Sequence, residues 1–146
     1  MAVRVLLTIG RDADPAALGP LPANARAEPW VSQHDVLPRA AAVVSHAGYG
    51  TTLGALEHGV AHVMLPLFAG DQWRTARRVA QLGAGLQLEE GERRVFDPPQ
   101  EAVIAALPEA VRRVLGKARF AEVARRLGDE MAGLPAVDAA AAALAA

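Results

Sequence analysis

The sequence predicts an α/β fold, a Rossmann-like parallel sheet flanked by helices, with a helical segment at its C-terminal end. Two observations predict this class. Short apolar runs typical of buried strands alternate with helical patterns, and glycines stand at the junction between one such strand and the helix after it. At 146 residues the chain is long enough for one domain with a substantial core. We expect that domain over residues 1–134, followed by an Ala-rich tail over 135–146.

The first part of the chain contains two extended segments. Val3–Ile9 is an apolar run that predicts a buried strand, and a turn-rich stretch with three prolines follows over Gly10–Asn24. Ala25–Val31 is predicted as a short extended piece, and His34–Arg39 as one or two helical turns.

The middle of the chain alternates between strand and helix. Ala41–Ser45 predicts a second buried strand, which ends in a glycine-punctuated segment. A helix is expected over Leu53–His58 and is stopped by Gly59. His62–Leu67 is predicted as the next strand.

The last part of the chain is mainly helical. Asp71 is expected to open a helix as its N-cap, and Gly83 to end it before a brief strand over Leu86–Leu88. One face of that helix carries Trp73, Ala76, Val79 and Ala80. From Glu101 onward we expect helix, with an apolar stripe at helical spacing. The stripe consists of Phe120, Val123, Ala124, Leu127, Met131 and Leu134.

Composition and charge exclude several classes of function. The balance of 15 basic and 16 acidic residues gives a net charge of −1, so no basic surface for nucleic acid or an anionic membrane is expected. The absence of cysteine excludes disulfides, thiolate chemistry and zinc sites built on cysteine. No apolar run approaches the roughly 18 residues that span a bilayer, and the N-terminus lacks the features of a signal peptide. We therefore expect a cytoplasmic protein with no membrane span and no nucleic-acid partner.

The segment after Ser45 carries the strongest functional indication. It runs His46-Ala47-Gly48-Tyr49-Gly50-Thr51-Thr52. Glycines permit close approach of the backbone to a ligand, threonines supply hydroxyls, and the following helix N-terminus offers unpaired N–H groups. These features favour a phosphate site in which His46 donates a further hydrogen bond. A tight turn that needs glycine for steric reasons alone is the alternative. The G-x-G-x-x-G and P-loop patterns both fail here.

Other positions stand in register with a known signature. They are Trp30-Val31-Ser32-Gln33, Val36-Leu37, the segment from Ser45 to Thr52, Gly59-Val60, Pro66 and Asp71-Gln72. Together they resemble the donor-binding motif of nucleotide-sugar-dependent glycosyltransferases with the two-Rossmann-domain (GT-B) fold. The chain is most similar to the C-terminal domain of the UDP-glycosyltransferase-like bacterial enzymes that glycosylate natural products. The resemblance runs from about Val3 to Leu134.

The resemblance implies a role for each matched residue. Trp30 would stack on the pyrimidine base, the Val31 backbone would contact the base edge, and Gln33 would lie along the ribose or phosphates. The diphosphate would be bound by His46, Gly48, Gly50, Thr51 and Thr52. Asp71 and Gln72 would hydrogen-bond the hydroxyls of the donor sugar. The alternatives are a core aromatic for Trp30 and a plain N-cap for Asp71. The remaining histidines, His34, His58 and His62, match no role and are expected at the surface or in structural positions.

Two departures from the family pattern bear on the donor. Gly54 stands where plant members carry a carboxylate that binds the ribose hydroxyls, which fits a dTDP-sugar better than a UDP-sugar. Ala61 replaces a proline, which affects rigidity more than chemistry. No Asp-x-Asp motif occurs, so a metal-independent protein without a cofactor is expected, with a UDP- or dTDP-sugar as the donor substrate.

The resemblance also implies that the chain is one part of a larger enzyme. The acceptor pocket and the general base lie in the N-terminal domain of this family, so we expect no catalytic residue here. The chain alone would bind nucleotide without turnover. The domain of this family opens with a strand and a helix before the strand that Val3–Ile9 resembles, and Gly10–Asn24 is too short and too proline-rich to hold that helix. Val3–Ile9 is therefore interpreted as the second strand of its domain, with the first strand and helix absent. Unpaired strand edges would follow, covered by closure of the sheet, by a second copy through strand exchange, or by a partner fragment.

The leading interpretation is therefore the donor-binding domain of an inverting hexosyl transferase acting on a natural-product-like acceptor. One alternative is a non-catalytic nucleotide-sugar-binding subunit that needs a partner chain. Another is a fragment of a GT-B nucleotide-sugar epimerase. The Asp71-Gln72 pair after Pro66 favours the transferase over the epimerase.

Overall fold

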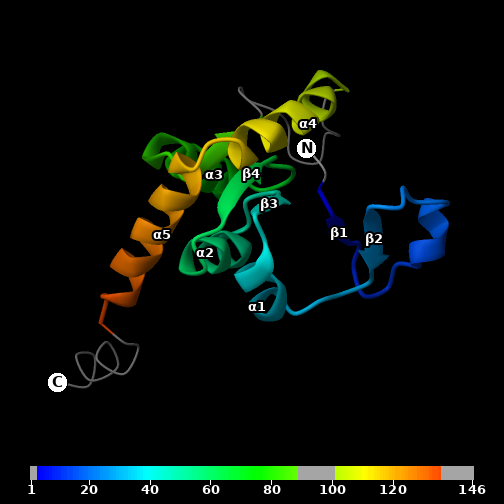
Figure 1. Ribbon diagram of the computed structural model, residues 1–146, viewed down its shortest axis with the longest axis horizontal. Coiled ribbons are helices and arrows are strands. Elements are labelled where there is room, and N and C mark those ends of the chain that lie inside the picture. Colours follow the sequence, from blue (N-terminus) through cyan, green and yellow to red (C-terminus); the bar gives the residue numbers. More distant parts are fainter. Residues whose placement is uncertain (1–2, 89–100, 136–146) are drawn as a thin grey trace. The chain divides into compact units, whose positions relative to one another are not determined.

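The computed structural model describes residues 3–88 and 101–135, and the chain divides into two units, Met1–Arg39 and Ala40–Ala146 (Figure 1). The domain that the sequence analysis expected over residues 1–134 includes residues of both units, and its bounds stay a prediction. Nearly all of the expected Ala-rich tail lies outside the described residues.

The first unit contains a two-stranded parallel sheet. Strands β1 (Val5–Thr8) and β2 (Ala25–Glu28) pair in register from Val5 opposite Ala25 to Thr8 opposite Glu28. Between them lies a 3₁₀ helix, η1 (Pro15–Leu18), which the sequence analysis did not predict. After β2 come the single-turn helix α1 (Gln33–Val36) and the 3₁₀ helix η2 (Leu37–Arg39). Both predicted extended segments and the short helical turns are confirmed, but the expected burial of the first strand is wrong, because all four residues of β1 are exposed.

The second unit contains a three-stranded parallel sheet in the order β3-β4-β5. The strands are β3 (Ala42–Ser45), β4 (Ala61–Met64) and β5 (Gly85–Gln87), which confirms the three predicted strands. Helix α2 (Tyr49–Glu57) connects β3 to β4, and helix α3 (Gly70–Leu82) connects β4 to β5. The parallel α/β class predicted from the alternating pattern is therefore correct.

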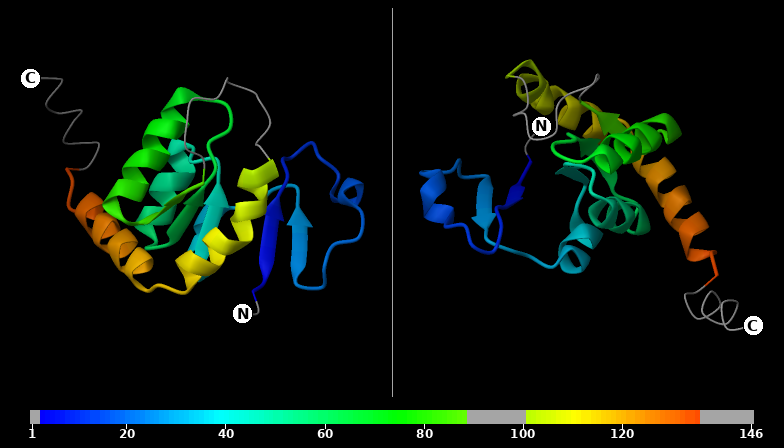
Figure 2. Two further views of the ribbon diagram at one scale, coloured as in Figure 1. Left: turned by 90° about the horizontal axis from the view of Figure 1, so that it is seen from above. Right: turned by 180° about the vertical axis from the view of Figure 1, so that it is seen from behind.

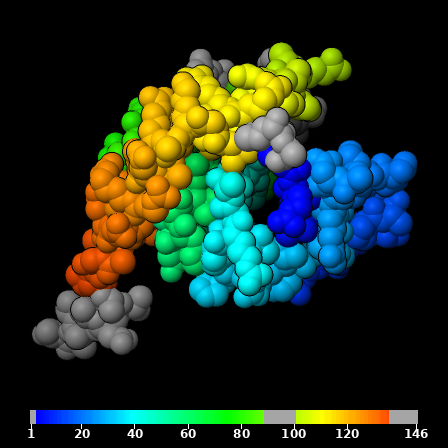
Figure 3. All heavy atoms as spheres, in the orientation of Figure 1, coloured from blue at the N-terminus to red at the C-terminus, as the bar shows by residue number. Residues whose placement is uncertain are grey.

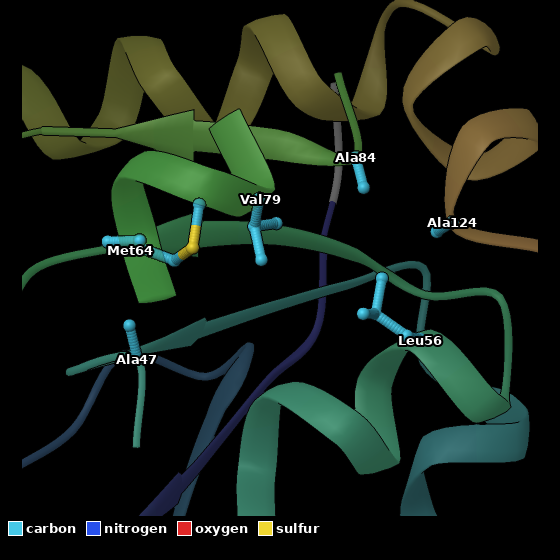
Figure 4. Packing of buried hydrophobic residues seen from close by; sticks show 7 residues of the cluster. Ala47, Leu56, Met64, Val79, Ala84 and Ala124 are labelled. Carbon is cyan, nitrogen blue, oxygen red and sulfur yellow. The ribbon is translucent and has the colours of Figure 1, made fainter. Parts of the chain in front are cut away.

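Strand β4 is buried on both faces and organises the core of this unit. On one face, Ala61 and Val63 pack with residues of helix α4 (Glu101–Leu115), which contacts all three strands of the sheet (Figure 2). On the other face, Met64 packs in a cluster supplied by α2, α3 and helix α5 (Arg119–Ala132) (Figure 4). That cluster consists of Ala47, Leu56, Met64, Ala76, Val79, Ala84 and Ala124. Helices therefore cover both faces of the sheet.

Helices α4 and α5 confirm the helical segment predicted from Glu101 onward. Val123, Leu127 and Met131 pack against the cluster around Met64, while Phe120 packs on the opposite face. The expected stripe is wrong at its last position. Leu134 is 68% exposed, because α5 ends at Ala132 and the chain no longer follows the helical period.

Two predicted helix starts are also wrong. Helix α2 begins at Tyr49 with Gly48 as its N-cap, four residues before the expected start at Leu53. Helix α3 begins at Gly70 with Ala69 as N-cap, whose backbone is extended at φ −142° and ψ 138°. Asp71 is therefore already helical and lies in the first turn, where a carboxylate also interacts favourably with the helix dipole.

Each sheet has one strand edge that the sequence analysis expected to be unpaired. In the described part of the chain, no strand pairs with the second edge of β1 or of β3. Val5, Leu6 and Leu7 of β1 are between 38% and 41% exposed, and this N-terminal part of the chain is drawn in dark blue in Figure 3. Association through these edges stays a prediction. No helix among the described residues is long and apolar enough to cross a membrane.

Gly128 allows the close packing of α5 on α2 and yields a stability prediction. A Cβ at this position would lie 2.4 Å from the Leu56 carbonyl oxygen, so Gly128→Ala should shift backbone and lower stability by about 1–3 kcal/mol. Gly133→Ala is the matched control, because its Cβ would make only ordinary contacts, the nearest at 3.5 Å. Urea unfolding measures both variants. Equal midpoints for Gly128→Ala and wild type would contradict this packing.

Candidate anion site at the β3–α2 junction

At the junction between β3 and α2, no side chain caps the N–H groups at the start of the helix. Only three residues separate Ser45 from Tyr49, and Gly48 caps the helix without any side-chain hydrogen bond to its N–H groups. Backbone pairing at this end begins with the Thr52 N–H, which donates to the Gly48 carbonyl at 3.0 Å. The N–H groups of Tyr49 and Gly50 precede it in the first turn, where helix geometry supplies no acceptor within the helix, and they lie at the positive end of the helix dipole. The arrangement is suited to an anion.

A left-handed turn at Ala47 makes this short connection. Ala47 has φ +65°, a conformation that costs a residue with a Cβ about 1–2 kcal/mol. Two contacts hold it there. Its N–H donates to the Ser45 hydroxyl oxygen at 3.1 Å, and its fully buried methyl group packs in the cluster with Leu56 and Met64 (Figure 4). Tertiary packing therefore maintains the strained turn.

Ser45 is in turn bound by His62 of the neighbouring strand. Ser45 Oγ and His62 Nε2 are 2.8 Å apart. The two side chains share a face of the sheet, because Val43 is the register partner of His62 and Ser45 follows two residues later. His62 is 1% exposed, and its Nδ1 has no hydrogen-bond partner. Burial, with a smaller contribution from the nearby His46, lowers the pKa of His62 to about 4. His62 is therefore neutral at pH 7.

His46 lies over Gly48 at the start of α2. A Cβ at Gly48 would come within 2.5 Å of His46 Nε2, so only glycine leaves room for the imidazole in this position. The other neighbour of the ring is Phe68, with the ring centroids 5.2 Å apart and the planes tilted by 32°. The structure thus brings His46 and Gly48 together at the open helix end, as the phosphate-site hypothesis requires.

The other three predicted diphosphate residues lie within the first turn of α2. Gly50 is not required for space, because a Cβ there would meet nothing within 4 Å. Thr51 is half-buried, whereas Thr52 is only 2% exposed. The Thr52 hydroxyl is buried without a hydrogen-bond partner, and the residue lines an apolar groove between α2 and α3. The diphosphate role of these residues stays a prediction.

The two predicted sugar-binding residues stand at the start of α3. Asp71 is exposed, but Gln72 is only 3% exposed. Gln72 Oε1 accepts hydrogen bonds from the backbone N–H groups of Leu67 and Phe68 at 3.0 and 3.2 Å. These two hydrogen bonds hold the loop in which Phe68 lies beside His46.

The three residues predicted to bind the nucleoside belong to the first unit. Trp30 is 55% exposed, so the alternative that it is a core aromatic is wrong. The guanidinium of Arg11 lies over its ring, 4.3 Å from the centroid. Val31 follows in the segment before α1 and is half-buried, while Gln33 is exposed as the first residue of α1.

No group of three His, Asp or Glu side chains that could hold a metal ion occurs in residues 3–88 and 101–135. Metal independence stays a prediction.

Sequence reasoning missed the partners that hold the junction. Ser45 was noted only as part of the motif, and His62 was expected to be a structural or surface residue. A histidine inside an otherwise apolar strand was the available indication. Its pairing with Ser45 depends on strand register, which the sequence does not show.

The fold is of the α/β class, with parallel strands and with helices on both faces of the three-stranded sheet. The chain belongs to the family described as the erythromycin biosynthesis protein CIII-like, C-terminal domain, which matches residues 2–146. It is thus a GT-B-type C-terminal domain, as the sequence analysis expected.

Named relatives agree with this family. The chain is 39% identical to the elloramycin glycosyltransferase of Streptomyces olivaceus over 124 residues, covering 85% of this chain and 28% of the relative. It is 35% identical to the 4'-demethylrebeccamycin synthase of Lentzea aerocolonigenes over 137 residues, covering 94% and 30%. Among solved structures, it resembles a spinosyn rhamnosyltransferase complexed with thymidine diphosphate at 29% identity and a TM-score of 0.81, covering 99% and 36%. The chain therefore spans about a third of the length of these relatives.

The buried His62 predicts a pH dependence of stability. Because its folded pKa of about 4 lies below the ordinary 6.5, the unfolded chain binds more protons between these values. The contribution of neutral His62 is complete above pH 6.5 and is lost as the pH falls towards 4, by about 3 kcal/mol. His62→Gln should therefore show a shallower fall than wild type.

Urea unfolding from pH 4 to 7.5 measures that difference, with His34→Gln as the control at an exposed histidine. Parallel pH profiles for wild type and His62→Gln would show that His62 is not buried in its neutral form.

Proposed function

We propose that this chain is the donor-binding domain of an inverting glycosyltransferase that transfers a sugar from a UDP- or dTDP-sugar to a small-molecule acceptor. One observation supports the proposal most strongly. The His46 imidazole lies beside Gly48, the N-cap of α2, directly after β3. A diphosphate would receive hydrogen bonds from the first N–H groups of the helix and from His46, and would meet the positive end of the helix dipole.

The relatives support a nucleotide-sugar donor and a natural-product acceptor. The spinosyn enzyme is a rhamnosyltransferase described in complex with thymidine diphosphate, and the elloramycin enzyme is a glycosyltransferase. Both names favour sugar transfer over epimerisation. We choose dTDP over UDP as the first probe, because Gly54 stands where a ribose-binding carboxylate is expected for UDP.

In the proposed reaction, the acceptor hydroxyl oxygen attacks the anomeric carbon while the bond from that carbon to the diphosphate oxygen breaks. The negative charge that develops on the leaving diphosphate would be stabilised by the α2 N–H groups and His46, without a metal ion. The acceptor proton goes to a general base outside this chain's site. We therefore expect this chain alone to bind nucleotide and to show no turnover. Its cytoplasmic location stays a prediction.

In this proposal, residues of the first unit would bind the nucleoside, and residues at the start of α3 would bind the sugar. Trp30 is exposed and flat, so a pyrimidine can stack on it, while the Val31 backbone and Gln33 contact the base edge and the ribose. The sugar hydroxyls would bind the exposed Asp71 carboxylate and the Gln72 carboxamide nitrogen. Gln72 Oε1 would keep its two backbone contacts during binding.

Calorimetric titration with dTDP tests the proposed site. Trp30→Ala should weaken binding about tenfold or more by removing the stacking surface, and His46→Ala should do so by removing a hydrogen bond to the charged diphosphate. Trp30→Phe, which retains an aromatic face, and His34→Ala, an exposed histidine outside the site, serve as controls. Equal affinities for wild type, Trp30→Ala and His46→Ala would reject the proposed site.

The Gly48→Ala variant is expected to lower dTDP affinity without lowering the stability of the fold. The added methyl group would displace the far end of the His46 side chain, which is 2.5 Å from the ideal Cβ position. Because the displaced group is a side chain rather than backbone, the unfolding midpoint should change little while dTDP affinity falls about as far as in His46→Ala. Gly50→Ala is the matched control, since its Cβ meets nothing within 4 Å. Unchanged affinity in Gly48→Ala would contradict the placement of His46.

A further inference from the structure

Ser45 and His62 share a hydrogen bond whose donor depends on which imidazole nitrogen of His62 carries the proton. Ser45 Oγ already accepts the Ala47 N–H at 3.1 Å, and His62 Nε2 lies 2.8 Å from the same oxygen. Neutral imidazole carries one N–H, so two arrangements are open. Either the Ser45 hydroxyl donates to Nε2 and the proton sits on Nδ1, or Nε2–H donates to Ser45 and the hydroxyl proton points elsewhere.

Burial distinguishes the two arrangements. His62 Nδ1 is buried and has no hydrogen-bond partner among the residues that the structure describes. In the first arrangement, a buried N–H donor would be left unpaired, which is rare and costly in folded proteins. In the second, the buried nitrogen carries only an unpaired lone pair, and the hydroxyl proton left over belongs to Ser45, which is only partly buried. The structure therefore favours Nε2–H as the donor and Ser45 Oγ as the acceptor of two hydrogen bonds.

The second arrangement leaves the Ser45 hydroxyl proton without an acceptor among the described residues. Ser45 itself is only partly buried and stands at the carboxyl end of β3, immediately before His46. Ligands of open parallel sheets bind at the carboxyl ends of the strands. A phosphate oxygen is the acceptor whose chemistry fits, because it carries negative charge and no proton at pH 7.

We propose that Ser45 is a further diphosphate-binding residue and that His62 is its positioning residue, turning the serine hydroxyl proton towards a phosphate oxygen. This inference rests on the proposed function, since it adds a donor to the same anion site. His62 acts only through Ser45, and the same serine oxygen also holds the strained turn at Ala47. The pair thus connects a buried strand residue to the ligand.

Binding of dTDP and of thymidine, followed by NMR titration on the chain, tests this proposal. Ser45→Ala and His62→Leu should each weaken dTDP binding about tenfold, and the double variant should be no weaker than Ser45→Ala alone. His62→Gln should restore affinity to within about threefold of wild type, because its carboxamide N–H can donate to Ser45 Oγ. Thymidine has no phosphate, so its affinity should stay unchanged in every variant.

Several outcomes would overturn the proposal. These are wild-type affinity in Ser45→Ala, independent losses in the double variant, or an equal loss for thymidine, which would indicate a general structural defect. A direct check is the ¹⁵N NMR spectrum of the His62 imidazole in wild type, where a proton on Nδ1 instead of Nε2 would contradict it. If wild type binds neither ligand, the proposed function fails as well. If Trp30→Ala loses affinity and Ser45→Ala does not, only this inference fails.

Discussion

The left-handed turn at Ala47 is the constraint on which the site depends. It lets the chain leave β3 and enter α2 after three residues, so the helix begins at Tyr49, close to His46 in the chain. A residue with a Cβ adopts this conformation only when its surroundings compensate for the strain. Here the Ser45 hydroxyl oxygen accepts a hydrogen bond from the Ala47 N–H, and the Ala47 methyl group is buried in the cluster that includes Leu56 and Met64. The core of the second unit therefore determines the geometry of its candidate site.

Strand β4 links that core to the site. Its alternate residues Ala61 and Val63 pack under α4, while His62 and Met64 face the side of α2 and α5. Burying a histidine in this layer is unfavourable unless it stays neutral and makes at least one hydrogen bond. Ser45 supplies that bond. Gln72 plays a comparable part on the next loop, where one buried side-chain oxygen accepts two backbone N–H groups and so places Phe68 beside His46.

The sequence predicted the order of strands and helices well, because short apolar runs and helical spacing are local properties. It failed at helix starts. Tyr49 and Gly50 lack strong local preference for helix, so packing of the helix decides that α2 begins there. Asp71 is favoured both as an N-cap and within a first turn, and the sequence alone does not separate the two. The contact between Ser45 and His62 was beyond sequence reasoning, since it depends on the register of two strands. The family resemblance predicted the Trp30 site, and its exposure fits that role.

The central claim is that the open N-terminus of α2 binds the diphosphate of a sugar nucleotide. Backbone amide NMR on the ¹⁵N-labelled chain, titrated with dTDP, tests it most directly. We predict that the largest chemical-shift changes fall on Gly48, Tyr49 and Gly50, and that thymidine, which lacks the diphosphate, leaves these amides unmoved. Binding of dTDP that leaves the first-turn amides of α2 unchanged while shifting residues elsewhere would contradict the account.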